Sequence, residues 1–308
     1  MSQGAGDIKR RIKSVKSTNK ITKAMELVSA AKMRKAVNKV LATRTYADLT
    51  WELILHLLKK VDIKHHPLFR ENNPASTGVK NVAVILIGTN RGLCGSFNNQ
   101  LARKVVASIQ LHHPETVSTD IITMGTKVRD EARRMKLNLI ADFPKNDITQ
   151  DSNVVRPIVN LIFKDFVNQK YDKVFVAYTD FMSSLRQIPH VKQLLPFSTE
   201  IDERLGHIIH EKEVSQKADL NKISEFIFEP NQAEILNNFL PRLLEVQLYQ
   251  TVLESEASEH SSRMFAMRNA SDAAQEMVSS LTLVYNQARQ ANITAEIAEI
   301  SAGASAAV

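Results

Sequence analysis

Glycine and proline are absent from two long stretches of this 308-residue chain, one near each end. Neither occurs in residues 7–66 or 242–302, whereas all nine prolines and six of the nine glycines lie between Pro67 and Pro241. Because both residues interrupt helices, two such stretches favour two long helices. The chain therefore reads as helix, globular middle and helix, with predicted domains at residues 1–66, 67–234 and 235–308.

The second stretch carries an apolar repeat of 3.5 residues, which is the pattern of a helix that coils around another helix. The apolar or small members of the series are Leu236, Phe239, Leu243, Val246, Leu253, Ala257, Met264, Met267, Ala274, Val278, Leu281, Tyr285 and Ala288. Its polar members are Gln250, His260, Ser271 and Asn292. About sixty residues of helix reach roughly 90 Å, so we expect this helix to protrude from any compact domain. Its polar last turns fit a frayed end and a surface of exchangeable contacts equally well.

The first stretch, residues 7–66, predicts a second long helix that can pair with the C-terminal one. We expect a helix over most of residues 7–60, with one apolar stripe at Ile8, Ile12 and Val15 and another at Ile21, Met25 and Val28. Neither terminal helix can cover its own apolar face, so the two are expected to pair as an antiparallel coiled coil.

The first helix is also strongly basic, with twelve Lys or Arg between residues 7 and 44 against two acids, Asp7 and Glu26. The whole chain has a formal net charge of +7. A solvated face, an acidic protein partner, nucleic acid or an anionic membrane surface each fit that charge. Residues 7–44 contain no aromatic side chain to stack on bases, which counts against nucleic acid. No run approaches 18 consecutive apolar residues, so no membrane span is expected.

The middle of the chain alternates short apolar runs with amphipathic segments, which predicts a mostly parallel, Rossmann-like α/β domain. The expected strands are residues 79–87, 120–124, 137–140 and 173–178, and the expected helices are residues 97–110, 126–135 and 154–167. Residues 188–197 and 225–228 are expected to be further edge strands, and residues 200–222 a loop.

A glycine-rich loop from Gly88 to Gly95 follows the first expected strand and precedes a helix. Such a loop can cradle a phosphate, or it can be a tight turn that needs glycine. It lacks the Lys-Ser/Thr of a Walker A loop, and no tyrosine has a lysine four residues later. Cys94 is the only cysteine, with no histidine within twelve residues, which favours a buried thiol over a nucleophile. No stretch by itself indicates an enzyme.

Several segments together resemble the γ subunit family of F-type ATP synthases, in its bacterial form. Residues 293–305 (ITAEIAEISAGAS) are similar to the family's C-terminal signature, and residues 21–33 (ITKAMELVSAAKM) to its basic N-terminal helix. Residues 91–95 (RGLCG), 194–196 and 258–264 are also similar to family segments. The resemblance covers the whole chain.

The resemblance implies a rotor without catalytic activity or cofactor. In the family, the paired terminal helices turn inside a ring of α and β subunits, which make or hydrolyse ATP, while the middle domain sits beside ε and the membrane ring of c subunits. It implies a role in ATP synthesis and hydrogen ion transport, and a peripheral position on the cytoplasmic face of the bacterial inner membrane. A dinucleotide-dependent oxidoreductase would explain only the glycine loop, and a nucleic-acid-binding coiled coil only the charge.

The resemblance also assigns roles to individual residues. The positions that match shaft contacts with the catalytic ring are Lys20, Lys23, Met25, Lys32, Arg263, Gln290, Thr294 and Glu296. The positions that match the foot segment near ε and the c ring are Phe226, Ile227, Phe228 and Glu229.

Overall fold

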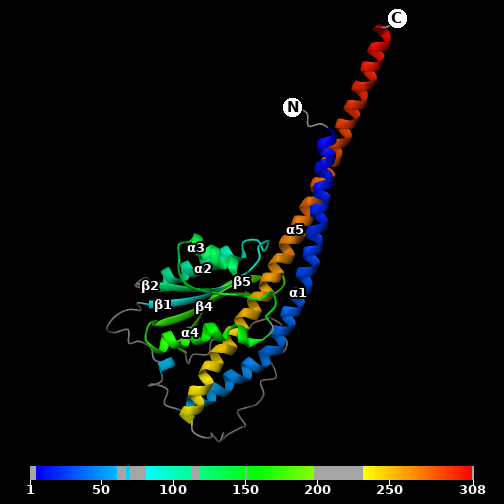
Figure 1. The fold of residues 1–308 in the computed structure, drawn as a ribbon. Helices are drawn as coiled ribbons and strands as arrows, with labels where there is room; N and C mark the ends of the chain where they lie inside the picture. Colours follow the sequence, from blue (N-terminus) through cyan, green and yellow to red (C-terminus); the bar gives the residue numbers. More distant parts are fainter. Residues whose placement is uncertain are drawn as a thin grey trace. The chain divides into compact units, whose positions relative to one another are not determined.

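Two long helices and a five-stranded sheet domain make up most of the described part of the chain (Figure 1). The structure, a computed structural model, describes residues 5–60, 67–69, 81–112, 118–149, 151–197 and 232–306. Helix α1 runs from Ala5 to Lys60 and helix α5 from Gln232 to Ala306. The two predicted long helices are thus confirmed. The strand expected at residues 225–228 and the loop expected at 200–222 lie outside the described residues.

Helix α5 begins before its only internal proline, Pro241, rather than after it. Proline lacks the backbone N–H of the helical ladder and crowds the preceding turn, so a helix start beyond it would be the simpler outcome. The residues around it, Leu240, Leu243 and Leu244, are buried in the core of the sheet domain. Burial of these side chains offsets the local cost of the proline.

The sheet domain alternates strands and helices as the sequence predicts. Its elements are η1 (Pro67–Phe69), β1 (Asn81–Ile87), α2 (Phe97–His112), β2 (Ser118–Met124), α3 (Thr126–Arg134), β3 (Asn138–Phe143), η2 (Ser152–Val154), α4 (Arg156–Val167), β4 (Lys173–Phe181) and β5 (Gln187–Leu195). The strand order is β3-β2-β1-β4-β5. All neighbours are parallel except β4 and β5, which confirms the predicted antiparallel edge strand.

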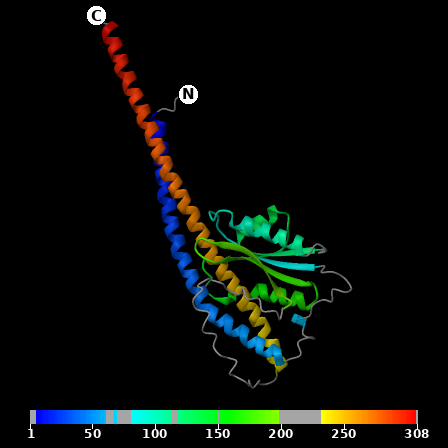
Figure 2. The same ribbon diagram turned by 180° about the vertical axis from the view of Figure 1, so that it is seen from behind.

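Both faces of the sheet are covered, which explains the continuous apolar run of β1. Val84 and Leu86 point into a core formed with α2 and α3, whereas Ile85 and Ile87 point into a second core formed with α4 and residues 240–252 of α5. Figure 1 shows α2 and α3 on one face of the sheet and α4 on the other, and Figure 2 shows the same layers from behind. The Rossmann-like prediction is confirmed.

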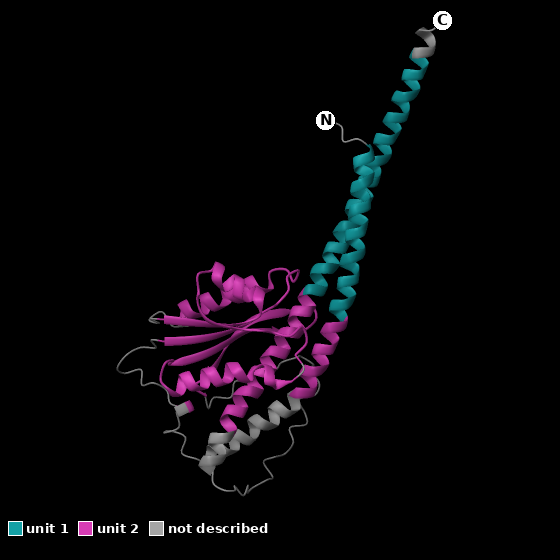
Figure 3. Cartoon of the chain, viewed as in Figure 1, with its two compact units in different colours: residues 1–30, 263–308 teal, residues 31–262 magenta. Residues whose placement is uncertain are grey.

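The chain divides into two compact units (Figure 3). The first comprises residues 1–30 and 263–308, which within the described range are lengths of α1 and α5 lying side by side in opposite directions. The second comprises residues 31–262, which contain the sheet domain and the remaining lengths of both helices. We call the first the coil unit and the second the sheet unit.

The predicted repeat of α5 matches its burial. Ser271, Ala274 and Val278 are buried in the coil unit, and the next members, Leu281, Tyr285 and Ala288, are the half-buried positions of the turns that follow. Asn292 is exposed, as is every residue of α5 from 289 to 302. We call the buried face along which α1 and α5 pack in the coil unit the seam, and on α5 it ends near residue 288.

One predicted stripe of α1 is wrong. Ile8 is buried and Ile12 and Val15 are half-buried as expected, but Ile21 is 60% exposed and Val28 55% exposed. A 3.5-residue repeat that starts at Ile8 continues through residues 12, 15, 19, 22, 26 and 29, and its last four side chains are Asn, Thr, Glu and Ser, each buried or half-buried. The helix buries these polar residues because backbone geometry, not side-chain hydropathy, decides which positions face the partner.

Among the residues that the structure describes, no helix has the length and hydropathy needed to cross a membrane. Within the same residues, no group of three or more His, Cys, Asp and Glu side chains is placed to hold a metal ion.

Candidate functional site

Polar contacts fix the register of the coil unit. Thr22 and Ser271 share a hydrogen bond between their hydroxyls at 2.7 Å, and both side chains are buried. The side-chain amide of Asn19 donates to the backbone carbonyl of Ser271 at 2.9 Å. Because a buried polar pair is satisfied in one alignment only, these contacts specify how the helices pair at some cost in stability. The sequence analysis recognised Ser271 as a seam position but missed its partners on α1.

Several large apolar side chains of the coil unit are exposed. On α1, Ile21, Leu27 and Val28 are each more than half exposed. The exposed large apolar residues of α5 in this unit are Met277, Leu283, Val284, Ile293, Ile297 and Ile300. A helix pair with apolar residues on outer faces as well as in its seam is characteristic of a surface that another protein covers.

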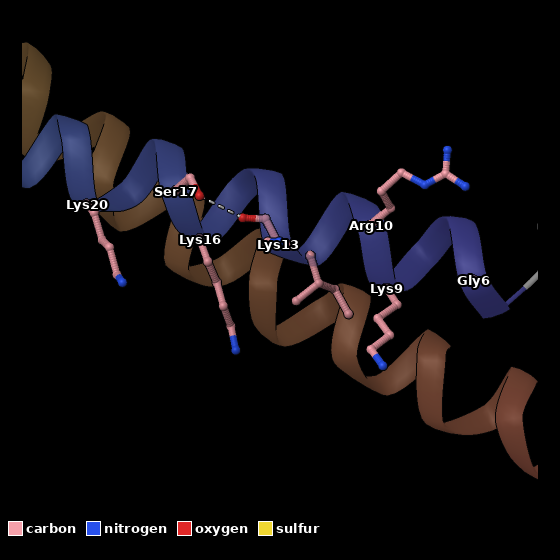
Figure 4. Close-up of a pocket in the computed structure, with 8 residues that line it drawn as sticks. Gly6, Lys9, Arg10, Lys13, Lys16, Ser17 and Lys20 are labelled. Atoms are coloured by element: carbon pink, nitrogen blue, oxygen red, sulfur yellow. Dashed lines mark hydrogen bonds between the residues drawn. The ribbon is translucent and has the colours of Figure 1, made fainter.

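A basic groove runs along the first turns of α1. Its volume is about 670 Å³, and the residues that line it are Gly6, Lys9, Arg10, Ile12, Lys13, Lys16, Ser17 and Lys20. Figure 4 shows Lys9, Lys16 and Lys20 on the same side of the helix, with Arg10 pointing to the other side. Arg10 pairs with Asp7 at 3.3 Å across an exposed turn. The remaining positive charge makes this face suited to an acidic surface.

The predicted contact residues of α1 differ in their surroundings. Lys20 is exposed at the end of the basic groove. Lys23 is also exposed, but its ammonium donates to Glu26 at 2.8 Å. Met25 is half-buried in the coil unit. Lys32 belongs to the sheet unit, where its ammonium lies 3.2 Å from the carboxylate of Asp147.

The predicted contact residues of α5 fall into two groups. Arg263 is only 7% exposed. Gln290, Thr294 and Glu296 are exposed beyond the end of the seam, and the hydroxyl of Thr294 donates to the backbone carbonyl of Gln290 at 2.9 Å. The surface positions are accessible to a partner, whereas the Arg263 side chain is enclosed within the chain itself.

The predicted foot residues cannot be placed in the same way. Phe226, Ile227, Phe228 and Glu229 lie outside the described residues. Their assignment stays a prediction of the resemblance.

The glycine-rich loop lies at the point where the strand order of the sheet reverses, between β1 and β4. A Cβ on Gly88 would lie 2.3 Å from the Cβ of Val128, so this residue lets α3 approach the end of β1. The backbone N–H of Thr89 donates to the side-chain oxygen of Asn98 at 3.1 Å. The backbone carbonyl of Thr89 accepts from the N–H of Lys127 at 2.8 Å. The glycine therefore serves helix–strand packing, and these polar groups are satisfied within the domain.

Doubly wound sheets bind ligands in the crevice outside the carboxyl ends of their strands, at this same reversal. Here α5 occupies that place. The hydroxyl of Ser255 donates to the carbonyl of Ile87, the last residue of β1, at 3.3 Å. Ala257 packs against Phe181, the last residue of β4, together with Ala36 of α1. The protein's own helices cover the strand ends that a dinucleotide would use, which argues against the oxidoreductase interpretation.

Helix α5 carries acidic side chains into this covered region. Glu254 is 2% exposed, and burial raises the pKa of its carboxyl to about 8, with a further contribution from Asp180. Burial also raises the pKa of Glu256, which accepts hydrogen bonds from the backbone and hydroxyl of Thr149. Sequence reasoning missed these acids because a glutamate on a helix is ordinarily a surface residue. Neither acid belongs to the 3.5-residue repeat of α5, so no local pattern marked them.

Comparison with known proteins agrees with this architecture. The family model for ATP synthase matches residues 5–307. The ATP synthase gamma chain of Herpetosiphon aurantiacus is 42% identical over 309 residues, covering 98% of each chain, and that of Roseiflexus castenholzii is 40% identical, covering 97% of each. The gamma chain of Xanthomonas axonopodis is 35% identical, covering 98% of this chain and 99% of the relative.

Solved structures share the fold. A chain of the Euglena gracilis mitochondrial ATP synthase (OSCP/F1/c-ring) has a TM-score of 0.64 at 17% identity, covering 98% of this chain and 94% of the other. A chain of the Tetrahymena thermophila mitochondrial ATP synthase central stalk and c-ring has a TM-score of 0.57 at 23% identity, with 82% and 99% covered.

A doubly wound sheet domain together with an antiparallel pair of long helices is the architecture that these comparisons match. The chain belongs to the γ subunit family of bacterial F-type ATP synthases.

Proposed function

We propose that this chain is the central rotor shaft of an F1Fo ATP synthase. It couples ion-driven rotation of a c ring to ATP synthesis or hydrolysis on a surrounding ring of α and β subunits. The observation that carries the proposal is the exposed end of α5, where residues 289–302 have no cover from the chain itself. A helix of this length with exposed Ile293, Ile297 and Ile300 needs an external sleeve, and its membership of the γ family says which one.

The surface of the coil unit suits a shaft that turns. Polar pairs such as Thr22–Ser271 lock the two helices to one another, so that the pair rotates as one body. The exposed face of α5 mixes isoleucines with Gln290, Thr294 and Glu296, so no single large apolar patch would hold one sleeve face tightly. Rotation then presents different side chains to each β subunit, which shifts its open and closed states by differential contact free energy.

The basic residues of α1 are the proposed contacts with acidic segments of the β subunits. Lys20 is exposed for such a contact, and Lys23 can exchange its partner Glu26 for an external carboxylate. Met25, two residues after Lys23, lies on the half-buried side of the helix. Lys32 is held by Asp147, and Arg263 is buried, so we assign both to positioning the shaft rather than to contacts with the ring.

The chain itself is proposed to be noncatalytic, with ATP chemistry on the α and β subunits. The sheet domain is proposed to sit at the base of the shaft, against ε and the c ring, with the foot residues 226–229 near the c-ring loops. The complex is proposed to lie at the cytoplasmic face of the bacterial inner membrane, with this subunit peripheral to the membrane.

Co-expression with candidate α and β subunits tests the proposal. One copy of the chain is expected to enter a stable ring that hydrolyses ATP, and a label on the sheet domain is expected to rotate during hydrolysis. The purified chain alone is expected to hydrolyse no ATP. Turnover by the chain after removal of the α and β subunits, or a ring that excludes the chain, would refute the proposal.

A further inference from the structure

The loop that follows β3, residues 144–149, is held by a deeply buried lysine. The side chain of Lys145 is 2% exposed. Its ammonium donates to the backbone carbonyl of Gly88, at the end of β1, at 2.9 Å and to the carboxylate of Glu259 on α5 at 2.7 Å. Lysine is almost never fully buried unless it is paired, because its charge must be compensated. This ammonium therefore ties the sheet to α5 at a fixed geometry.

The last residue of the same loop holds both long helices. The backbone N–H of Thr149 donates to the two carboxylate oxygens of Glu256 at 2.9 and 3.1 Å, and its hydroxyl also donates to that carboxylate. Its carbonyl accepts from the ammonium of Lys39, on α1, at 2.6 Å. One residue of the sheet domain is thus bonded to α1 and α5 through charged groups.

Asp147, a third residue of the loop, also contacts both long helices. The carboxylate of Asp147 lies 3.2 Å from the ammonium of Lys32 on α1 and 3.3 Å from the guanidinium of Arg91 in the glycine-rich loop. Its backbone carbonyl lies 3.2 Å from the Nε2 of His260 on α5. Three alternate residues of one short loop therefore each contact a long helix of the sheet unit.

The contacts of Lys145 and Thr149, which involve buried charges, differ in kind from the apolar part of the interface between α5 and the sheet. Residues 240–252 of α5 pack against the sheet through apolar side chains. Apolar contact is non-directional, so a helix can roll or slide on such a surface while most of the area stays buried. Hydrogen bonds to buried charges are lost as soon as their geometry changes, which leaves the charges uncompensated. The second kind of contact therefore adds a directional resistance to twisting that apolar packing lacks.

We propose that residues 144–149 form the joint that transmits torque between the sheet domain and the two long helices, with Lys145 as the positioning residue that pins it. The joint occupies the edge of the sheet where related doubly wound folds hold a ligand, so that a crevice for binding has become a mechanical connection. This inference rests on the proposed rotor function, because only a rotor carries a twisting load between these parts.

The test uses the assembled complex in membrane vesicles with variants of the joint. Lys145→Met removes the ammonium that compensates the buried Glu259 carboxylate, whereas Lys145→Met combined with Glu259→Met removes both charges and keeps the volume filled. The matched control is Arg156→Met with Glu245→Gln. That pair, at 3.3 Å, also connects α5 to the sheet domain, but its arginine side chain is 49% exposed.

Ion pumping per ATP hydrolysed is measured at low and at high opposing ion gradient. For the double variant we expect a normal ratio at low gradient and a ratio lowered by at least about twofold at high gradient, because the joint slips only under load. ATP hydrolysis by the detached catalytic ring, where the sheet domain carries no load, should be unchanged. A merely structural defect would lower the amount of complex but not this ratio. The control pair should behave as wild type at both gradients.

If the double variant pumps like wild type against the high gradient, the proposal that residues 144–149 transmit torque is refuted. The failure of the proposed function is distinguishable, because then the wild-type chain itself would support no ATP-driven pumping with its partner subunits.

Hydrogen exchange on the full chain gives a second readout if a variant does not assemble. In Lys145→Met, amide exchange of residues 145–149 and of residues 254–260 should accelerate together by about tenfold or more, since the joint and α5 lose a shared contact. The control pair should leave both segments unchanged. Unchanged exchange of residues 254–260 in Lys145→Met would refute the connection.

Discussion

The buried carboxyl of Glu254 makes the stability of the sheet unit depend on pH. The side chain is 2% exposed, and burial is the main reason that its pKa rises to about 8, with Asp180 as the second cause. Three neighbours favour the charged form and partly oppose the shift. They are Gln250, whose amide donates to the Glu254 carboxyl at 3.3 Å, and Lys192 and Tyr178.

The sign of the effect follows from proton binding. Between the unfolded pKa of about 4.5 and the folded pKa of about 8, the folded state holds a proton that the unfolded state has released. The free energy of unfolding therefore falls as pH rises through this window. A shift of about 3.5 units corresponds to about 5 kcal/mol in full, of which about 4 kcal/mol is lost between pH 5 and pH 9.

Glu254→Gln tests this reasoning, because glutamine resembles the protonated carboxyl and does not titrate. We expect the variant and the wild type to have similar unfolding free energies at pH 5, measured by urea denaturation of the full chain. At pH 9 the variant should be more stable than the wild type by about 4 kcal/mol. Glu276→Gln, an exposed position on the same helix, is the control and should differ from wild type by no more than about 0.5 kcal/mol throughout. A stability difference between Glu254→Gln and wild type that stays constant from pH 5 to pH 9 would refute the argument.

Three further substitutions test other parts of the structure. Gly88→Ala should lower the unfolding free energy by about 2 kcal/mol or more, because the new methyl would lie within 3 Å of α3, whereas Gly92→Ala, with nothing within 4 Å, should be nearly neutral in the same denaturation assay. Ser271→Ala should cost about 1 kcal/mol by leaving the Thr22 hydroxyl without its buried partner, and a double-mutant cycle with Thr22→Val should show that the two effects are not additive; additive effects would contradict the pairing. Met25→Lys should lower ion pumping per ATP in the assembled complex by adding a charge beside the proposed acidic contact, and an unchanged pumping ratio would count against that contact.

Much of the architecture could be predicted from local pattern. The absence of Gly and Pro predicted the two helices. The alternation of apolar runs with amphipathic segments predicted strands of the sheet domain, including the buried strand β1. The seam of α5 from Ser271 to Ala288 was predicted because its apolar residues keep a constant period. These features depend only on residues close together in the sequence.

Apolar character alone misled on α1. Ile21 and Val28 looked like a stripe, yet Asn19, Thr22 and Ser29 take the seam positions. The repeat counted forward from Ile8 leads to these polar residues, so the period was the better guide than hydropathy. The exposed Ile21 and Val28 are consistent with the proposed ring of α and β subunits around the helices. The sequence of this chain alone does not contain that ring.

The sequence by itself determined the helices, the strands, the segments that carry the family resemblance and the excess of positive charge. Only the tertiary structure decided that α5 closes the carboxyl edge of the sheet and that Lys145, Asp147 and Thr149 bind the long helices there. The partners of these residues lie up to 115 positions away in the chain. Local pattern carries no signal for such contacts, because a lysine or glutamate that is buried and paired has the same identity as one on the surface. Folding alone brings the two charges together and removes the water between them.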